Sequence, residues 1–134
     1  PWHQDNGYWR CNPPDLVSIW MALDDADEEN GCMNVIPGSH LESAAGHNRA
    51  RSEKGALPAL LEAEVDEARA VPVSVKAGYA VVHHCLMLHQ TNPNRSDRDR
   101  RAMVIHYMPS GTRNAKDEVM ADRLLLRGEQ VDTQ

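Results

Sequence analysis

The first residues in this sequence that could hold a metal ion are a histidine and an aspartate near its start. His3 and Asp5 lie two positions apart. On a strand, residues i and i+2 point to the same side, so both side chains could reach one point in space. The pair alone is a weak signal, because short patterns of this kind arise by chance and an exposed strand carries them equally well. A metal site therefore needs a further ligand elsewhere in the chain.

That further ligand is predicted at His89, which follows the apolar run Leu86-Met87-Leu88. A histidine in a buried strand needs a partner, which can be a metal ion, a carboxylate or a hydrogen bond in the core. We expect a polar hairpin over residues 92–99, which would place Arg100 about opposite His89 on the returning strand. Opposed residues of an antiparallel pair share one face, and a buried arginine beside a histidine is suited to gripping a carboxylate.

Two histidines and one carboxylate leave three positions of an octahedral ion open, and this is the ligand set of non-haem Fe(II) oxygenases. Zinc with the same ligands would normally be tetrahedral with one open position, so it ranks second as the native ion. Arg100 favours iron with 2-oxoglutarate, because the keto-acid end of that cosubstrate chelates the metal and its far carboxylate needs an anchor.

Other histidines are weaker candidates. His83 and His84 are adjacent, so on a strand they point to opposite faces and cannot both join one site. His83 shares strand parity with His89 if the strand is unbroken, which makes it the one plausible substitute ligand. His106 is interpreted as a core histidine with a hydrogen-bonding partner.

Short strands must position these residues. Asn30-Gly31 signals a turn, residues 41–55 read as an exposed loop, and residues 56–69, rich in Ala, Leu and Glu, favour a short helix. Many short strands with one minor helix predict a mainly β chain, arranged as an antiparallel sandwich or barrel. The strand patterns cover residues 15–23, 32–36, 71–75, 79–82, 85–91 and 101–108.

Composition limits the function classes. A chain of 134 residues fits a single domain, residues 1–134, with a core of its own. The formal net charge of −6 argues against nucleic-acid partners and anionic membranes. No apolar run approaches the roughly 20 residues of a membrane helix, and no signal peptide is visible. The three cysteines form no C-x-x-C pair and predict buried thiols in a reducing, cytoplasmic setting. The start at Pro1 predicts that the chain is a fragment.

Several blocks of this sequence, in order over residues 1–109, resemble the phytanoyl-CoA dioxygenase family. The resemblance implies a double-stranded β-helix (jelly roll) that lacks the family's N-terminal part, so that residues 1–134 would be the C-terminal catalytic core. The blocks are Trp2-His3-Gln4-Asp5, Asn30-Gly31-Cys32-Met33-Asn34-Val35-Ile36-Pro37-Gly38-Ser39-His40, Leu88-His89, Pro93-Asn94-Arg95-Ser96 and Arg100-Arg101-Ala102.

The resemblance also implies the cofactors, Fe(II) and 2-oxoglutarate, and a role for each site residue. For Trp20, a plain core aromatic is an equally good interpretation. Gln90 stands where the family usually has glycine, and a bulkier residue there could narrow the pocket. The implied iron ligands are His3, Asp5 and His89, and the implied 2-oxoglutarate contacts are Arg100, Trp20 and Thr91.

The predicted function is hydroxylation of a C–H bond in a small-molecule substrate by O2, with release of succinate and CO2. The carboxylate of Asp5 favours hydroxylation over halogenation, because related halogenases have a small residue there, while desaturation and ring closure stay open. Two alternatives are a truncated jelly roll that binds metal without turnover and a cupin-like metal enzyme that does not use 2-oxoglutarate. Exposed sheet edges would favour self-association as a homo-oligomer.

Overall fold

The structure, a computed structural model, describes residues 1–42, 44–49, 61–120 and 123–129. These residues form short strands with almost no α-helix, which confirms the mainly β prediction. No helix in the described ranges is long and apolar enough to cross a membrane. The elements are α1 (Asn6–Trp9), β1 (Val17–Ala22), β2 (Met33–Val35), the 3-10 helix η1 (Ser39–Leu41), β3 (His47–Arg49), β4 (Leu61–Ala63), the 3-10 helix η2 (Glu67–Arg69), β5 (Val71–Val73), β6 (Ala80–His84), β7 (His89–Thr91) and β8 (Ala102–Tyr107).

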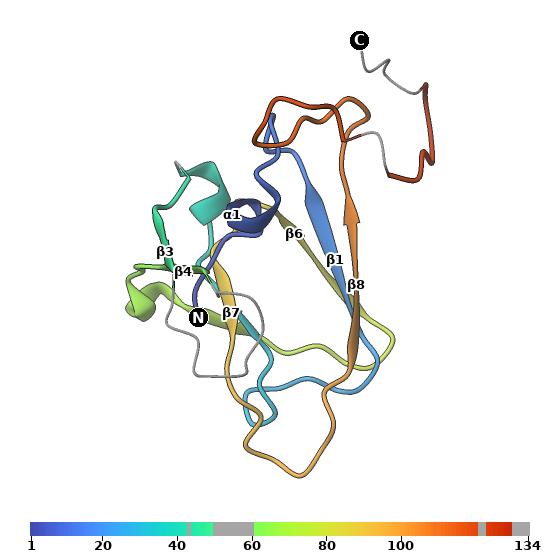
Figure 1. The fold of residues 1–134 in the computed structure, drawn as a ribbon. Coiled ribbons are helices and arrows are strands. Elements are labelled where there is room, and N and C mark those ends of the chain that lie inside the picture. Colours follow the sequence, from blue (N-terminus) through green and yellow to red (C-terminus); the bar gives the residue numbers. More distant parts are fainter. Residues whose placement is uncertain (43, 50–60, 121–122, 130–134) are drawn as a thin grey trace.

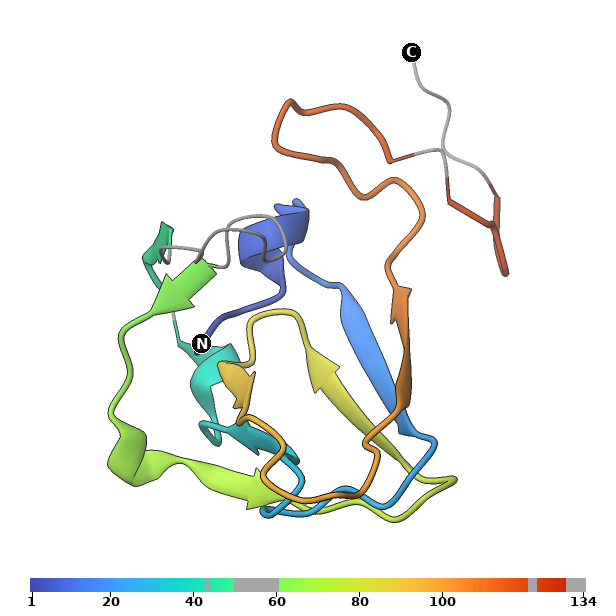
Figure 2. The same cartoon turned by 60° about the horizontal axis from the view of Figure 1, so that its bottom comes forward.

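Six of these strands form two antiparallel sheets of three strands each. One sheet has the order β6-β1-β8 and the other β5-β2-β7, while β3 and β4 pair separately. From β5 onward, successive strands belong to alternate sheets, so both sheets contain strands from the same stretch of the chain (Figures 1 and 2). Strands that alternate between two sheets are expected for a jelly roll.

The core lies between the two sheets. Along β1, Ser18, Trp20 and Ala22 are buried and alternate with half-buried neighbours, as the two-residue period of a strand requires. Trp20 and Ala22 pack with Met33 of β2 in one buried cluster. The buried face of β1 therefore packs against the buried face of β2.

The predicted hairpin between β7 and β8 was wrong. β7 pairs with β2, whereas β8 pairs with β1 along its whole length. Residues 92–101 thus cross from one sheet to the other, and Arg100 is not the strand partner of His89. The polar and turn-forming residues of this segment predict a reversal of the chain, but they do not specify which sheet receives the next strand.

The prediction for residues 41–69 was also wrong where the structure can be compared. β3 occupies part of the expected loop, and β4 and η2 replace the C-terminal part of the expected helix. Residues 56–60 of that helix lie outside the described residues. Helix propensity is a weak prior that pairing between strands overrides.

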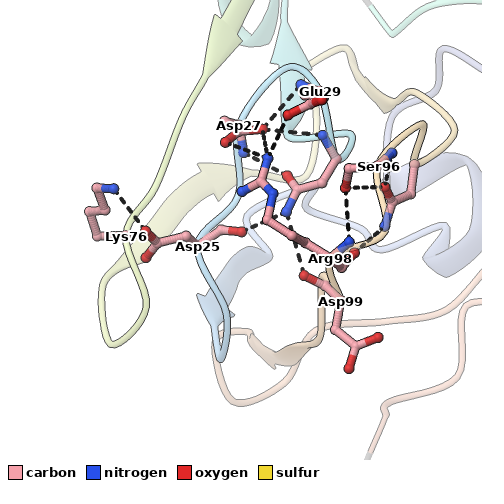
Figure 3. A network of polar contacts seen from close by, with 9 residues as sticks. Asp25, Asp27, Glu29, Lys76, Ser96, Arg98 and Asp99 are labelled. Carbon is pink, nitrogen blue, oxygen red and sulfur yellow. Dashed lines mark hydrogen bonds and ion pairs between the residues drawn. The ribbon is translucent and has the colours of Figure 1, made fainter.

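The path of residues 92–101 from one sheet to the other is fixed by contacts between two loops that run side by side at one end of the sheets (Figures 1 and 3). Arg98 donates hydrogen bonds to both carboxylate oxygens of Asp27, at 2.9 Å each, and to Glu29 at 3.1 Å. The buried Asn30 side chain donates to the backbone carbonyl oxygens of Asp25 and Asp99. The exposed ion pairs contribute little individually, but the network joins the β1–β2 loop to the β7–β8 loop.

Arg101 anchors the start of β8 and so determines which way its neighbour Arg100 lies. The Arg101 guanidinium donates two hydrogen bonds to Asp24, at 2.9 and 2.7 Å, and the Arg101 backbone N–H donates a third at 2.8 Å. The side-chain hydrogen bonds and then the backbone one lower the pKa of Asp24 to about 2. Arg101 is thereby held outward, and Arg100 lies on the parity of the half-buried Ala102, which packs against the core.

Gly31 offers a test of how closely the two loops approach. Its φ is +85°, and a Cβ built there would lie 2.3 Å from the carbonyl oxygen of Asn92. Gly38 has a similar φ of +83° but nothing within 4 Å. We expect Gly38→Ala to lower the free energy of unfolding by about 1–2 kcal/mol, the cost of a left-handed residue. Gly31→Ala should cost at least about 3 kcal/mol, because the clash adds to that strain.

Urea denaturation of the two glycine variants and the wild type checks this prediction. Equal losses in the two variants would mean that the β1–β2 and β7–β8 loops do not meet as closely as described.

The Asp24–Arg101 contact predicts a pH dependence. Because the folded pKa of Asp24, about 2, lies below its ordinary value of 3.8, this contact stabilises the fold above pH 4. The contribution is lost as the pH falls through the folded pKa. We expect Arg101→Gln to return the pKa of Asp24 toward 3.8. Carboxyl-carbon NMR titration measures it directly, and an unchanged low pKa in the variant would contradict the assignment of its cause.

Candidate metal centre

A backbone bridge brings the first and last candidate ligands together. The N–H of His3 donates to the carbonyl of His89, and the N–H of His89 donates back to the carbonyl of His3, both at 3.0 Å. The two residues are thus directly opposed in an antiparallel bridge, which places both side chains on one face. Their ring centroids lie 4.3 Å apart.

Asp5 reaches the same point from a helix rather than from a strand, so the expectation that His3 and Asp5 share a strand was wrong. Asp5 has helical backbone angles, φ −55° and ψ −35°, and occupies the N-cap position of α1, where its side chain makes no capping hydrogen bond. The next residue, Asn6, donates its N–H to the carbonyl of Cys85 at 3.0 Å. With the chain turned in this way, the Asp5 Oδ1 atom lies 3.8 Å from His3 Nε2 and 3.6 Å from His89 Nε2.

Gln4, which sequence reasoning did not single out, secures this segment from the opposite side. Its side chain is buried, with 1% exposed. The amide nitrogen donates to the carbonyl of Leu86 at 2.8 Å, and the amide oxygen accepts from the N–H of Ala45 at 2.9 Å. A polar residue between two candidate ligands, pointing away from them, thereby fixes the segment from which they project.

Hydrogen bonds to backbone carbonyls set the tautomers of both histidines. His89 Nδ1 lies 2.9 Å from the carbonyl oxygen of Met87, and His3 Nδ1 lies 3.1 Å from that of Pro1. A carbonyl oxygen only accepts, so each Nδ1 carries the proton and each Nε2 carries the lone pair. This arrangement, with Nδ1–H bonded to a carbonyl and Nε2 directed at the metal, is common for histidine ligands.

The charge states also suit metal binding. Burial opposes ionisation of Asp5, but hydrogen bonds from His83 and Ser18 and the nearby His89 outweigh it and hold the pKa of Asp5 well below its usual range. Burial, together with the proximity of His3, lowers the pKa of His89 to about 4. At neutral pH this leaves an anionic carboxylate beside a neutral imidazole, the forms in which both residues bind metal.

The outer oxygen of Asp5, Oδ2, faces the β6-β1-β8 sheet. Ser18 on β1 donates its hydroxyl to Oδ2, and His83 Nε2 on β6 lies 3.3 Å from the same atom. His106 Nδ1 on β8 lies 2.9 Å from the Ser18 hydroxyl. Ser18 is opposite both histidines in the strand register. Sequence reasoning missed Ser18, although a serine on the buried parity of an apolar strand was a usable signal.

The side chains of His3, Asp5 and His89 fit an octahedral metal ion. Each offers one ligand atom, and these atoms lie within 4.8 Å of one another. Two imidazole nitrogens and one carboxylate oxygen on one side of the ion match the donors that Fe(II) takes in non-haem oxygenases. The arrangement can therefore bind such an ion and leave its other side open.

The three predicted cosubstrate contacts differ in burial: Trp20 is buried, Arg100 is half-buried and Thr91 is exposed. Trp20 is buried and packs with Met33. Thr91 is exposed and is the strand partner of Met33. The Nε atom of Arg100 is buried and makes no hydrogen bond within the described ranges. A buried guanidinium nitrogen without a partner is costly, and the far carboxylate of 2-oxoglutarate would satisfy it. Arg100 therefore fits that group.

The chain is similar in sequence to known proteins. The family described as Phytanoyl-CoA dioxygenase (PhyH) matches residues 1–102. Phytanoyl-CoA dioxygenase domain-containing protein 1 homolog from Caenorhabditis elegans is 34% identical over 113 residues, which cover 79% of this chain and 39% of that protein. The chain thus spans about two fifths of the length of this relative.

Solved structures extend the comparison. EvdO2 from Micromonospora carbonacea var. aurantiaca, complexed with 2-oxoglutarate, is 31% identical with a TM-score of 0.68, covering 87% of this chain and 47% of that one. The Ni complex of the non-heme monooxygenase ThoJ is 30% identical with a TM-score of 0.70, covering 97% and 44%. The similarity to these proteins confirms the jelly-roll prediction.

The ligand set predicts the effect of single substitutions on metal binding. Asp5→Ala and His89→Ala should each weaken Co(II) binding at least about 100-fold, because each removes one of three donors. His89→Ala keeps the bridge to His3, which uses backbone atoms only.

The matched control is His84→Gln, a histidine on the same strand as His83 whose Nδ1 accepts a hydrogen bond from the Leu86 N–H. It should bind Co(II) like the wild type in equilibrium dialysis. Undiminished binding by the Asp5 or His89 variant would place the metal elsewhere.

Proposed function

This chain belongs to the phytanoyl-CoA dioxygenase family, and on that premise we propose that it is the iron-binding core of an Fe(II)- and 2-oxoglutarate-dependent oxygenase. The family resemblance and the cofactors predicted from the sequence, Fe(II) and 2-oxoglutarate, are confirmed for the family. Iron with 2-oxoglutarate and O2 supplies the oxidising power for hydroxylating a C–H bond, with release of succinate and CO2.

The observation that carries the proposal is the convergence of His3, Asp5 and His89. Their ligand atoms lie within 4.8 Å of one another, and hydrogen bonds from Nδ1 to backbone carbonyls direct both imidazole Nε2 lone pairs to one side. The three residues would hold iron on one face, which leaves room for a bidentate cosubstrate and O2 on the other.

The remaining site residues would position the cosubstrate. Arg100, whose Nε atom is buried without a hydrogen bond in the described part of the chain, would grip the far carboxylate of 2-oxoglutarate. Trp20 would exclude water from the inner face of β1, and the Thr91 hydroxyl would donate a hydrogen bond. Positioning and the exclusion of water are the protein's share of such chemistry.

Hydroxylation is the reaction that the ligand set supports best. The Asp5 carboxylate occupies the position that a halide would need, so the site favours oxygen transfer.

The chain spans 39% of its C. elegans relative, and this fact favours one alternative: a jelly roll that binds metal without turnover. Succinate formation separates the two functions. Purified protein would be supplied with Fe(II), 2-oxoglutarate and O2, and succinate measured with and without Asp5→Ala. Succinate that depends on Asp5 supports the oxygenase. Metal binding without any succinate would leave only the metal-binding function.

Arg100 and Arg69, an exposed arginine of the 3-10 helix η2, form a matched pair for testing the cosubstrate site. We expect Arg100→Gln to raise the 2-oxoglutarate concentration at half-saturation at least about tenfold, because charged hydrogen bonds contribute about 1.5–3 kcal/mol. Fe(II) affinity should not change. Arg69→Gln, which breaks the exposed contact with Glu42, should leave half-saturation as in the wild type.

The readout is the visible charge-transfer band of anaerobic protein with Fe(II) and 2-oxoglutarate. A wild-type concentration dependence in Arg100→Gln would exclude this arginine as the anchor of the cosubstrate.

A further inference from the structure

The two oxygens of the Asp5 carboxylate face different partners. Oδ1 faces His3 Nε2 and His89 Nε2, at 3.8 and 3.6 Å. Oδ2 accepts a hydrogen bond from Ser18 and lies 3.3 Å from His83 Nε2. The metal-facing oxygen and the restrained oxygen are therefore separate atoms.

His83 is placed to hold the carboxylate rather than the metal. It is 6% exposed, and its ring centroid lies 4.6 Å from that of His89. The described ligand atoms that gather within 4.8 Å of one another come from His3, Asp5 and His89 and do not include His83. His83 is therefore not one of the residues that would hold the ion.

The proton positions agree with this role. An ionised carboxylate oxygen only accepts, so His83 Nε2 must donate to Asp5 Oδ2. The other ring nitrogen, Nδ1, is buried and has no hydrogen-bond partner among the residues that the structure describes. On the other side, the Ser18 hydroxyl gives its proton to Asp5, so His106 Nδ1 donates to the Ser18 oxygen. Two donors from two strands thus converge on one oxygen.

We propose that His83, together with Ser18, is a positioning residue that holds the outer oxygen of Asp5 and keeps this carboxylate a one-oxygen ligand. The inference rests on the proposed metal site. A carboxylate free to rotate could bind the ion through both oxygens and would occupy one of the positions left for the cosubstrate and O2. By restraining Oδ2, the β6-β1-β8 sheet keeps three positions open.

The test uses the 134-residue chain with Co(II) and compares substitutions that separate hydrogen bonding from packing. His83→Phe keeps an aromatic ring and removes the donor, whereas His83→Gln keeps an N–H donor near the position of Nε2. We expect His83→Phe and Ser18→Ala each to weaken Co(II) affinity by about 10- to 100-fold, the usual effect of losing such a partner. His83→Gln should recover most of the affinity.

The matched control is His84→Phe, an adjacent histidine whose Nδ1 accepts a hydrogen bond from the Leu86 N–H and which should bind Co(II) like the wild type. Circular dichroism verifies that each variant is folded before its affinity is measured.

Proton NMR of the Co(II)-loaded wild type adds a readout that needs no variant. Each histidine bound through Nε2 gives one strongly shifted Nδ1–H signal, and the carbonyl partners of His3 and His89 slow its exchange with water. We expect two such signals. Three signals would make His83 a ligand and overturn the inference, as would equal Co(II) affinities of wild type and His83→Phe. Failure of the wild type to bind Co(II) would instead overturn the metal site itself.

Discussion

The reciprocal backbone hydrogen bonds between His3 and His89 are the constraint on which the candidate site depends. They join the first residues of the chain to β7, so the backbone alone directs both histidine side chains to the same side. Because the bonds use only backbone atoms, the geometry does not require a bound metal. Gln4 reinforces the bridge from behind, through its buried contacts with Leu86 and Ala45.

The two sheets supply the contacts that orient Asp5, which the bridge between His3 and His89 does not provide. β7 carries His89 in one sheet, while the opposite sheet carries Ser18 and His83, which meet Asp5 from the other side. Each sheet thus contributes contacts to one carboxylate. The crossing of residues 92–101, fixed by the Arg98 network in Figure 3 and by Asp24, delivers Arg100 to the inner side of β8. The site is therefore assembled from segments that are distant in the sequence.

Local patterns predicted the elements better than their partners. The run of strand formers along β1 and the apolar residues of β2, β6 and β8 were sufficient to place those strands. These patterns did not show which strand β8 would pair with, because strand order depends on contacts across the whole sheet. Asp5 was assigned to a strand on spacing alone, whereas its backbone is helical. The spacing of His3 and Asp5 allowed both geometries, and tertiary contacts chose between them.

Residue types predicted the iron ligands, but the residues that orient them carried little signal. Ser18 and Gln4 matter through single hydrogen bonds to distant atoms, and such pairing is visible only in three dimensions. His83 was considered as a substitute ligand because it shares strand parity with His89. The turn after β6 breaks the strand between them, so parity could not decide between ligand and hydrogen-bond donor.

Asp5 shows why these orienting residues are needed before any metal arrives. It is a largely buried carboxylate, with 14% of its side chain exposed, and an unpaired buried charge is costly. Ser18 and His83 satisfy one oxygen in the metal-free protein, and His89 beside the other favours the ionised form. A metal ion would therefore meet ligands that are already charged and oriented. In this respect the site differs from small zinc domains, in which the metal must also drive folding.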